Sequence, residues 1–473
     1  MDQRCSMPKS DLLPNASFFP LDGLRQRQFP PDGTLIDSVR GHLEQMAELA
    51  PGEQEALSLL LKSLSACNPS LLELGALPPE AVLSAEEVEV YRRLLAWPTT
   101  SARTLPKVLT LIVKGTRLCN LRCTYCRSWA EGKDQVMPFS VLARTIQAAC
   151  TASGVGHVEF VWHGGETTLR PVSFYRKAMW LQERFRSPGL RIYNRIQTNG
   201  TTLDSDWLRF LKDYKFAVGI SLDGPPEVHD LRRLDIHGRP TSERVRSGIE
   251  RLKQDEIPFE IKMVVDDEVI ALGAHRTLEY FLAIGVRQVS LLNVVPDGEP
   301  DRRLPGDYLE FSRYVDFLRD LFRLWWPTYV DRISFQEISD LIRRLEQGNG
   351  SFCVFGENCM GSIYTIEPQG EIAACDRFQG NSAFRFGNVL ESDLADLLAS
   401  PNLVSAQIQT DTDMDRASRC PWFRICQGGC PHDRYVRRHR SASSAEGCCG
   451  WSPLLADLAW ALGQTNHGTT GSE

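Results

Sequence analysis

The feature that most constrains the fold is a regular alternation of strand-like and helix-like segments between about residues 105 and 294. Six runs are apolar and rich in β-branched side chains, and amphipathic stretches such as 139–150 and 171–186 separate them. Alternating strands and helices form parallel sheets with right-handed crossovers. Six units are too few for a closed eight-stranded barrel, so the pattern predicts an α/β fold with an open, partial (β/α)6 barrel. The predicted strands cover residues 108–113, 157–162, 190–196, 216–222, 258–265 and 286–294.

The remaining segments are expected to surround a barrel domain at 104–330. Residues 1–103 read as a mostly helical module, which would either cap the barrel or dock a peptide. A helical bridge is expected at 331–350, and a cysteine-rich domain at 351–450. Residues 451–473 read as a C-terminal helix and tail.

Charge and hydropathy exclude several classes of protein. Asp and Glu outnumber Lys and Arg by 60 to 53, a net charge of −7, whereas nucleic-acid-binding proteins usually carry a basic footprint. No apolar run approaches the roughly 18 to 20 residues that cross a bilayer. Residues 1–18 lack the apolar core of a secretory signal. We therefore expect a cytoplasmic protein that binds neither nucleic acid nor membrane.

The fourteen cysteines are grouped rather than scattered. Structural disulfides are rare in a reducing cytoplasm, so grouped cysteines favour metal sites. One group, Cys119, Cys123 and Cys126, follows the first predicted strand directly. Eight more cysteines lie between residues 353 and 449. Cys150 shares a helical face with Leu142 and reads as a core thiol.

The first group has the spacing C-x3-C-x2-C. Thiolates are the preferred ligands of iron–sulfur clusters, and a four-iron cluster normally uses four of them. Three thiolates on one loop would leave one iron open to a substrate, as a catalytic metal requires. The alternative is a zinc site completed by a distant residue, although zinc sites usually show paired C-x2-C units.

With Tyr125 before the last cysteine, this loop resembles the signature of radical S-adenosylmethionine (SAM) enzymes. The resemblance implies a [4Fe-4S] cluster on Cys119, Cys123 and Cys126, with SAM bound to its open iron and Tyr125 beside the cofactor. In that family, reductive cleavage of SAM releases a 5′-deoxyadenosyl radical, which abstracts hydrogen from the substrate. The protein positions and shields this chemistry.

Three further motifs follow predicted strands, where sites in parallel sheets form. The resemblance implies that Gly164, Gly165 and Glu166 hold the SAM ammonium group, and that Asn199 and Ser221 help to position SAM. Taken singly, Asn-Gly and Asp-Gly-Pro are common turns. The sequence His229-Asp230-x-Arg232 also matches peptide-modifying relatives, and its alternative interpretation is a structural ion pair.

The C-terminal cysteines resemble the SPASM extension of radical SAM enzymes that modify peptides, including anaerobic sulfatase-maturing enzymes and cyclophane-forming peptide maturases. The resemblance implies one or two auxiliary [4Fe-4S] clusters. The first would use Cys353, Cys359, Cys375 and Cys430. The second would use Cys420, Cys426 and Cys448.

Ala417 stands where the family has a further cysteine for the second auxiliary cluster. Cys449 could fill that gap, the cluster could keep an open iron, or it could be lost. A zinc ribbon is the alternative for the whole region, but ribbons favour C-x2-C units and none is present here. Asp376 follows an auxiliary ligand directly. Its place implies a catalytic base by resemblance to sulfatase-maturing enzymes, while a carboxylate that bonds loop amides is the alternative.

Three functions are compatible with these motifs. The sequence favours a maturase that abstracts hydrogen from a ribosomally made precursor peptide and forms a carbon–carbon, cyclophane-type crosslink. The first alternative is a sulfatase maturase that makes formylglycine from Cys or Ser. The second is a non-catalytic electron-transfer or binding protein, which an open iron disfavours. About 100 residues precede the barrel, and Ala417 departs from the sulfatase-maturing pattern; both favour the peptide maturase. An external donor such as flavodoxin or ferredoxin is expected to supply electrons.

Overall fold

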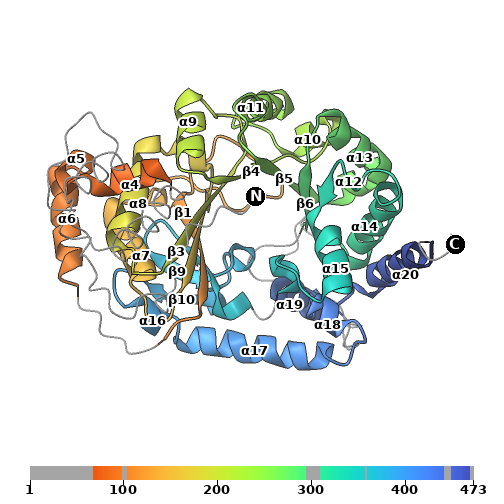
Figure 1. Ribbon diagram of the computed structural model, residues 1–473. Coiled ribbons are helices and arrows are strands. Elements are labelled where there is room, and N and C mark those ends of the chain that lie inside the picture. Colours follow the sequence, from red (N-terminus) through yellow and green to blue (C-terminus); the bar gives the residue numbers. More distant parts are fainter. Residues whose placement is uncertain (1–67, 98–103, 295–308, 357–358, 441–448, 469–473) are drawn as a thin grey trace, which may run out of the picture.

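The computed structural model describes residues 68–97, 104–294, 309–356, 359–440 and 449–468 (Figure 1). Within these residues the predicted alternation of strands and helices is confirmed, and each of the six predicted strands overlaps an observed one. The strands are β1 (Val108–Thr116), β2 (His157–Gly164), β3 (Arg191–Thr198), β4 (Ala217–Ser221), β5 (Phe259–Val265), β6 (Gln288–Asn293), β7 (Ser334–Phe335), β8 (Ile363–Ile366), β9 (Glu371–Ala374) and β10 (Arg385–Asn388).

Helices fill most of the connections between strands and extend the chain at both ends. Before and within the barrel they are α4 (Pro69–Ala76), α5 (Pro79–Val82), α6 (Ala85–Leu95), α7 (Phe139–Cys150), α8 (Val172–Phe185), α9 (Ser205–Asp213), α10 (Pro226–Arg232), α11 (Ser242–Gln254), α12 (Asp267–Leu272) and α13 (Ala274–Ala283). After it come α14 (Phe311–Trp325), α15 (Gln336–Gln347), α16 (Leu394–Leu397), α17 (Pro401–Ala417), α18 (Phe423–Cys426), α19 (Pro431–Arg440) and α20 (Ser452–Gly468).

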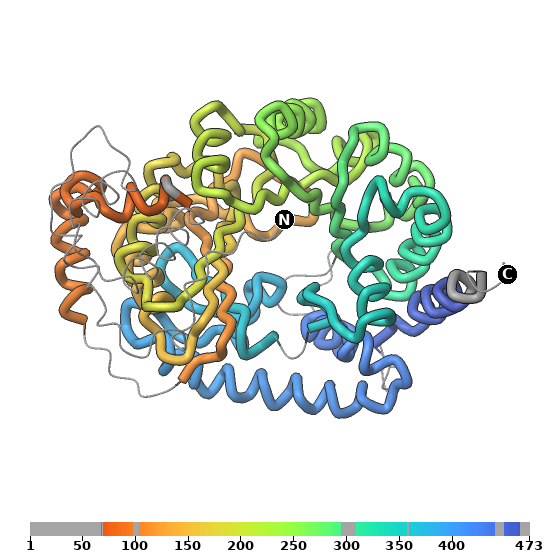
Figure 2. The backbone as a smooth tube through the Cα atoms, in the orientation of Figure 1, coloured from red at the N-terminus to blue at the C-terminus, as the bar shows by residue number. Residues whose placement is uncertain are grey.

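All ten strands belong to one sheet, in the order β10-β9-β8-β1-β2-β3-β4-β5-β6-β7. Strands β1 to β7 are parallel to their neighbours, which is the predicted partial barrel with one short strand added. The cysteine-rich domain adds β8 parallel to β1, then β9 and β10 antiparallel. Figure 2 shows the barrel as an arc with the C-terminal part of the chain along its open side. This topology brings the end of β1 next to the turns of the cysteine-rich domain.

The two faces of the barrel strands differ in burial. In β2, alternate residues are fully buried, and Trp162 packs edge-on against Phe174 and Tyr175 of α8. Because side chains alternate across a strand, the residues between them point into the barrel. His157 and His163 are both on this inner face, at opposite ends of β2. The helices therefore shield the outer face, and the inner face is left for chemistry.

Residues 68–97 pack onto the outside of the barrel. Glu87 of α6 pairs with Lys177 of α8 at 2.6 Å, and Trp180 of α8 donates to the carbonyl of Leu77 at 3.0 Å. This part of the N-terminal module therefore acts as a cap on the helices, one of the two roles the sequence left open. A peptide-docking role for the module at residues 1–103 stays a prediction, and residues 1–67 and 98–103 of that module lie outside the described residues. None of the described helices combines the length and apolarity that crossing a bilayer requires.

Candidate active site

The loop after β1 brings the first three cysteines together. Nearby Cys123 and Cys126 thiols act on the pKa of Cys119, so the three side chains share one site. The loop also points backbone donors at sulfur: the N–H of Leu121 lies 3.3 Å from Cys119 Sγ, and the N–H of Ser128 lies 3.3 Å from Cys126 Sγ. Hydrogen bonds to cluster sulfurs raise the reduction potential of an iron–sulfur centre.

The third thiol, Cys123, faces a buried ion-pair network. Arg233 Nη1 lies 3.8 Å from Cys123 Sγ, and Arg233 Nε lies 2.7 Å from Asp223 Oδ2. Asp223 also pairs with Arg232 at 2.7 Å and accepts a hydrogen bond from the Tyr125 hydroxyl at 2.6 Å. Burial would raise the pKa of Asp223, but the two guanidinium groups outweigh it and lower that pKa. The network leaves a cation beside the cluster loop.

His229 and Arg232 of the His229-Asp230-x-Arg232 motif belong to the same network. Arg232 pairs with both Asp223 and Asp266, which is the structural ion pair that the sequence left as one alternative. His229 accepts a hydrogen bond from the Asp223 backbone through Nδ1, at 3.2 Å. Tyr125 thus sits against two arginines, at 5.1 and 5.5 Å from its ring centre, and its contact with SAM stays a prediction.

The thiols of the first group must lose their protons before they can bind a metal. Burial, then the Glu166 carboxylate, raises the pKa of Cys119 to about 12, and burial raises that of Cys123 to about 11. Both thiols are therefore neutral without metal, and an iron–sulfur cluster must displace their protons to bind. Three sulfur ligands on one loop, each facing an N–H donor, are a donor set that fits such a cluster.

Gly164 and Gly165 allow the cluster loop to cross the end of β2. Gly164 has φ +141°, and a Cβ there would lie 2.1 Å from the carbonyl oxygen of Thr116. A Cβ at Gly165 would lie 2.2 Å from the carbonyl oxygen of Leu118. The close approach that the paired glycines make possible is therefore between two protein backbones. Their direct contact with SAM stays a prediction.

Replacing Gly165 by alanine is expected to displace residues 117–119 and to lower cluster occupancy at the first three cysteines. The reason is steric, because backbone carbonyls on both Arg117 and Leu118 would lie within 2.3 Å of the added Cβ. Iron content after anaerobic reconstitution, with the cluster EPR signal, measures the loss. Gly156→Ala is the matched control, since its nearest neighbour would be 3.7 Å away. Equal iron content in the two variants would contradict the steric explanation.

Glu166 joins the loops after β2 and β3. Its carboxylate accepts hydrogen bonds from the Thr168 N–H at 2.9 Å, the Thr168 hydroxyl at 2.6 Å, the Thr198 hydroxyl at 2.6 Å and the Asn199 N–H at 2.8 Å. Three of these bonds reach Oε1 and one reaches Oε2, so the described protein donors occupy Oε1 fully and leave an acceptor position on Oε2. Glu166 thus fixes the loops of the predicted SAM site, and its contact with the SAM ammonium stays a prediction.

The two remaining SAM candidates also lie at this end of the barrel. Asn199 donates to Asn120 of the cluster loop at 2.9 Å, so the loop after β3 is tied to the cysteine loop. Ser221 ends β4 and accepts a hydrogen bond from Gln197 at 2.9 Å. The structure therefore brings all the predicted SAM residues to the carboxyl ends of β1 to β4.

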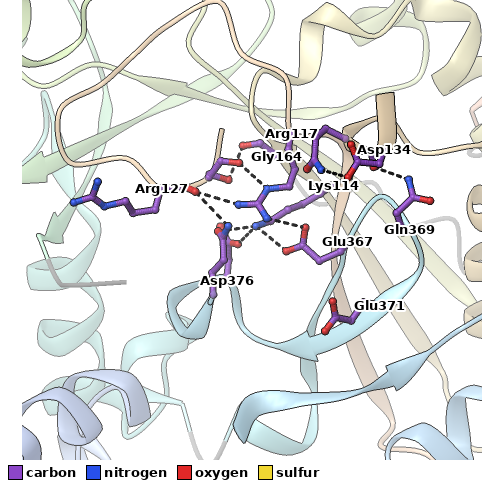
Figure 3. A network of polar contacts seen from close by, with 12 residues as sticks. Lys114, Arg117, Arg127, Asp134, Gly164, Glu367, Gln369, Glu371 and Asp376 are labelled. Carbon is purple, nitrogen blue, oxygen red and sulfur yellow. Dashed lines mark hydrogen bonds and ion pairs between the residues drawn. The ribbon is translucent and has the colours of Figure 1, made fainter. Parts of the chain in front are cut away.

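Asp376 lies at the junction between the barrel and the cysteine-rich domain (Figure 3). Its Oδ1 is 2.5 Å from the ammonium of Lys114, a fully buried residue of β1. Lys114 also pairs with Glu367 at 3.2 Å and donates to Gln379 at 2.8 Å. Burial would raise the pKa of Asp376, but Lys114 and the nearby His163 outweigh it and hold that pKa below its usual value. The carboxylate is therefore ionised at neutral pH.

The four thiols predicted for the first auxiliary cluster lie near one another, and their role as ligands stays a prediction. The thiols of Cys353, Cys375 and Cys430 all raise the pKa of Cys359, and burial raises the pKa of Cys353 to about 11 and of Cys375 to about 12. Arg377 is buried beside them and pairs with Asp433 at 2.6 Å. In the described part of the chain, no three acidic, His or Cys side chains could hold a single metal ion, whereas a four-iron cluster spreads its ligands over separate irons. The four thiols fit a cluster of that kind.

The second auxiliary group is partly described. Cys426 and Cys449 bring their sulfurs to 3.2 Å, so Cys449 lies where a ligand of this group is needed. Cys420 Sγ lies 3.7 Å from the Ser452 hydroxyl on the same turn as Cys449. Ala417 is buried at the end of α17 and brings no thiol. Cys448 lies outside the described residues, and its role as a ligand stays a prediction.

Sequence reasoning missed several charged residues that hold the site together. Lys114 interrupts an otherwise apolar strand directly before the cysteine loop, and this was the one signal available for it. Arg233 and Arg377 gave no such signal, because each acts through partners that are distant in sequence. His163 directly precedes Gly164 in the sequence, and no role was predicted for it from the sequence.

Comparison with known proteins agrees with this geometry. The model of the radical SAM superfamily matches residues 113–269, and that of SPASM, an iron–sulfur cluster-binding domain, matches residues 353–431. The cysteine-type anaerobic sulfatase-maturating enzyme of Clostridium perfringens is 30% identical over 343 residues, 69% of this chain and 89% of that enzyme. The serine-type enzyme of Klebsiella aerogenes is 29% identical over 356 residues, 72% of this chain and 83% of that enzyme.

A solved structure of native anSMEcpe with bound AdoMet and Cp18Cys peptide has the same fold, with a TM-score of 0.66 and 28% identity. The match covers 75% of this chain and 97% of that one. Membership of the superfamily implies SAM and iron–sulfur clusters as cofactors, which the grouped thiols fit. The chain therefore belongs to the radical SAM superfamily, in the family of SPASM-containing maturases that includes the anaerobic sulfatase-maturating enzymes.

Proposed function

We propose that this enzyme oxidises a cysteine or serine side chain of a protein or peptide substrate to formylglycine. The observation that carries the proposal is the position of Asp376, an ionised carboxylate between the SAM-binding end of the barrel and the first auxiliary cysteines. Similarity to cysteine-type and serine-type sulfatase-maturating enzymes, and to a structure with a bound peptide, supports it. Formylglycine formation, the first alternative in the sequence analysis, therefore takes precedence over the crosslink that the sequence favoured.

The residues divide the work between positioning and proton transfer. Cys119, Cys123 and Cys126 would hold the cluster, which with SAM supplies the radical that takes a hydrogen atom from the substrate. Glu166 orders the surrounding loops through four hydrogen bonds. Asp376 would take part in removing the proton that the oxidised residue gives up, the catalytic role that the sequence resemblance implies. The auxiliary thiols would hold clusters that take up the remaining electron, and flavodoxin or ferredoxin would supply the first one.

A second candidate is the carbon–carbon crosslink in a precursor peptide. Ala417 favours it, because the second auxiliary group lacks a thiolate that the sulfatase-maturing pattern has at that place. Both reactions need one hydrogen atom, one proton and one electron to leave the substrate. They differ in what remains: formylglycine carries an aldehyde, and a crosslink does not.

An anaerobic assay with two peptides separates these candidates. One is a sulfatase-derived peptide with its target Cys or Ser, and the other is a precursor peptide encoded beside the enzyme. Formation of a hydrazide-reactive aldehyde in the first peptide is the expected result. Loss of two hydrogens from the precursor peptide without any aldehyde would instead establish the crosslink and overturn formylglycine formation.

A further inference from the structure

His163 is placed to take part in the reaction, although none of the roles described so far requires it. It is the penultimate residue of β2, on the inner face of the barrel, with 31% of its side chain exposed. Its direct neighbour across the sheet is Lys114 of β1. Gly164 and Gly165, which contact the cluster loop, come directly after His163 in the sequence. The imidazole thus lies between the cluster loop and Asp376.

The two oxygens of Asp376 have different surroundings. Oδ1 is 2.5 Å from the Lys114 ammonium, and Oδ2 faces His163 Nδ1 at 3.7 Å. The second distance is longer than a hydrogen bond, and among the described residues Nδ1 of His163 has no hydrogen-bond partner. A partly exposed imidazole whose buried Nδ1 lacks a hydrogen-bond partner among the described residues and faces a carboxylate resembles the base-and-orienter pairs of other enzymes.

Lys114 makes Asp376 a poor final acceptor for a proton. An ammonium in direct contact stabilises the ionised carboxylate, so protonating it means weakening a buried ion pair. Glu367 and Gln379 hold Lys114 in place at 3.2 and 2.8 Å, so the ammonium is not free to turn away. A neutral imidazole next to that carboxylate does not carry this cost, and the carboxylate would stabilise it once protonated.

We propose that His163 receives the proton from the reacting residue of the substrate, and that Asp376 acts through it as the positioning carboxylate. This inference rests on the proposed function and assigns its proton-transfer step. One hydrogen atom leaves the substrate carbon for the 5′-deoxyadenosyl radical. An auxiliary [4Fe-4S] cluster held by the C-terminal thiols would be the oxidant that accepts one electron, and the imidazole would accept one proton. A carbon–oxygen double bond forms from serine and a carbon–sulfur double bond from cysteine. In the cysteine case, water then adds to the thioaldehyde and hydrogen sulfide leaves, which gives the same aldehyde.

The groups facing His163 set its pH dependence. Burial lowers the pKa of His163; Asp376, from the turn after β9, raises it, Lys114 of β1 lowers it, and Glu166 of the loop after β2 raises it. The net effect is a pKa below the usual value, so the imidazole is neutral and able to accept a proton at neutral pH. As the pH falls through that pKa, the imidazole becomes charged, and product formation is expected to fall.

The test compares His163→Gln with His157→Gln in the reconstituted full-length enzyme. Glutamine keeps a polar side chain but cannot accept the proton. His157 is a matched control, because it lies on the same face of β2, stacked on Tyr193 at 4.5 Å, away from Asp376. The substrate is the Cys or Ser peptide deuterated at its target β-carbon. Deuterium in 5′-deoxyadenosine measures hydrogen abstraction, and aldehyde per 5′-deoxyadenosine measures the later steps.

His163→Gln is expected to retain deuterium transfer while its aldehyde yield per 5′-deoxyadenosine falls by about 100-fold, the usual contribution of a general base. His157→Gln is expected to match the wild type. An unchanged yield in His163→Gln would overturn this inference alone. Absence of deuterium transfer in the wild type would overturn the proposed function and the inference with it. If His163→Gln also loses deuterium transfer, the pH dependence of the wild type tests the role of His163 instead. A wild-type yield of aldehyde per 5′-deoxyadenosine that does not fall at acid pH would overturn that role.

Discussion

Replacing Cys119, Cys123 and Cys126 together by alanine is expected to abolish reductive cleavage of SAM. The three thiols form one site on the loop after β1, inside the segment that matches the radical SAM superfamily. Formation of 5′-deoxyadenosine from SAM and dithionite under anaerobic conditions measures the effect. The product should fall to the level of a reaction without enzyme, because the uncatalysed reaction has no comparable route.

Iron content gives an independent reading of the same variant. The wild type should bind more than about eight irons, and the triple variant about four fewer, because one four-iron cluster is lost. Cys150→Ala is the matched control, since this thiol is buried in α7 and belongs to none of the cysteine groups. It should keep both iron content and SAM cleavage. Persistent 5′-deoxyadenosine formation by the triple variant would contradict the assignment of the radical site.

The barrel could be predicted from sequence because its signals are local. Each strand is a short apolar run, and the Cys119 loop, the Gly164 pair and Asn199 all follow strand ends directly. In parallel sheets the carboxyl ends of strands meet at one edge, so placing each motif after a strand already places the motifs together. The structure adds what the glycines do, namely admit the backbone of Thr116 and Leu118.

The junction between the two domains could not be predicted in this way. Asp376 meets Lys114 because β8 pairs with β1, and that pairing joins residues more than 250 positions apart in sequence. No local pattern reports which sheet edge a distant hairpin will extend. For the same reason Arg233 was missed: its contact with Cys123 depends on how α10 folds back over the cluster loop.

The junction also explains why a base and an electron acceptor would lie close together. Asp376 is adjacent in sequence to Cys375, whose thiol belongs to the first auxiliary group. On its other side the carboxylate is held by Lys114, one strand residue beyond the β1–β8 pairing. A proton and an electron leaving one substrate residue would thus be received within one small region. A peptide substrate would have to reach the end of β1 to use it.

Replacing Asp376 by asparagine is expected to leave SAM cleavage intact and to reduce product per 5′-deoxyadenosine by about 100-fold, as loss of a general base or of its orienting carboxylate does. Asparagine keeps the shape of the side chain but removes the negative charge that faces Lys114 and His163. The measurement is aldehyde, or crosslink, per 5′-deoxyadenosine in single-turnover reactions with the peptide substrate.

Glu367→Gln is the matched control for Asp376→Asn. Glu367 pairs with the same ammonium at 3.2 Å, so both variants remove one negative charge from Lys114, but only Asp376 faces His163. The control should keep product per 5′-deoxyadenosine close to the wild type. If both variants lose product equally, the charge balance at Lys114 is what matters, and Asp376 is not the base. If Asp376→Asn keeps full yield, the Asp376 carboxylate takes no part in proton removal, either directly or through His163. The variant has no negative charge at that position to stabilise a protonated imidazole.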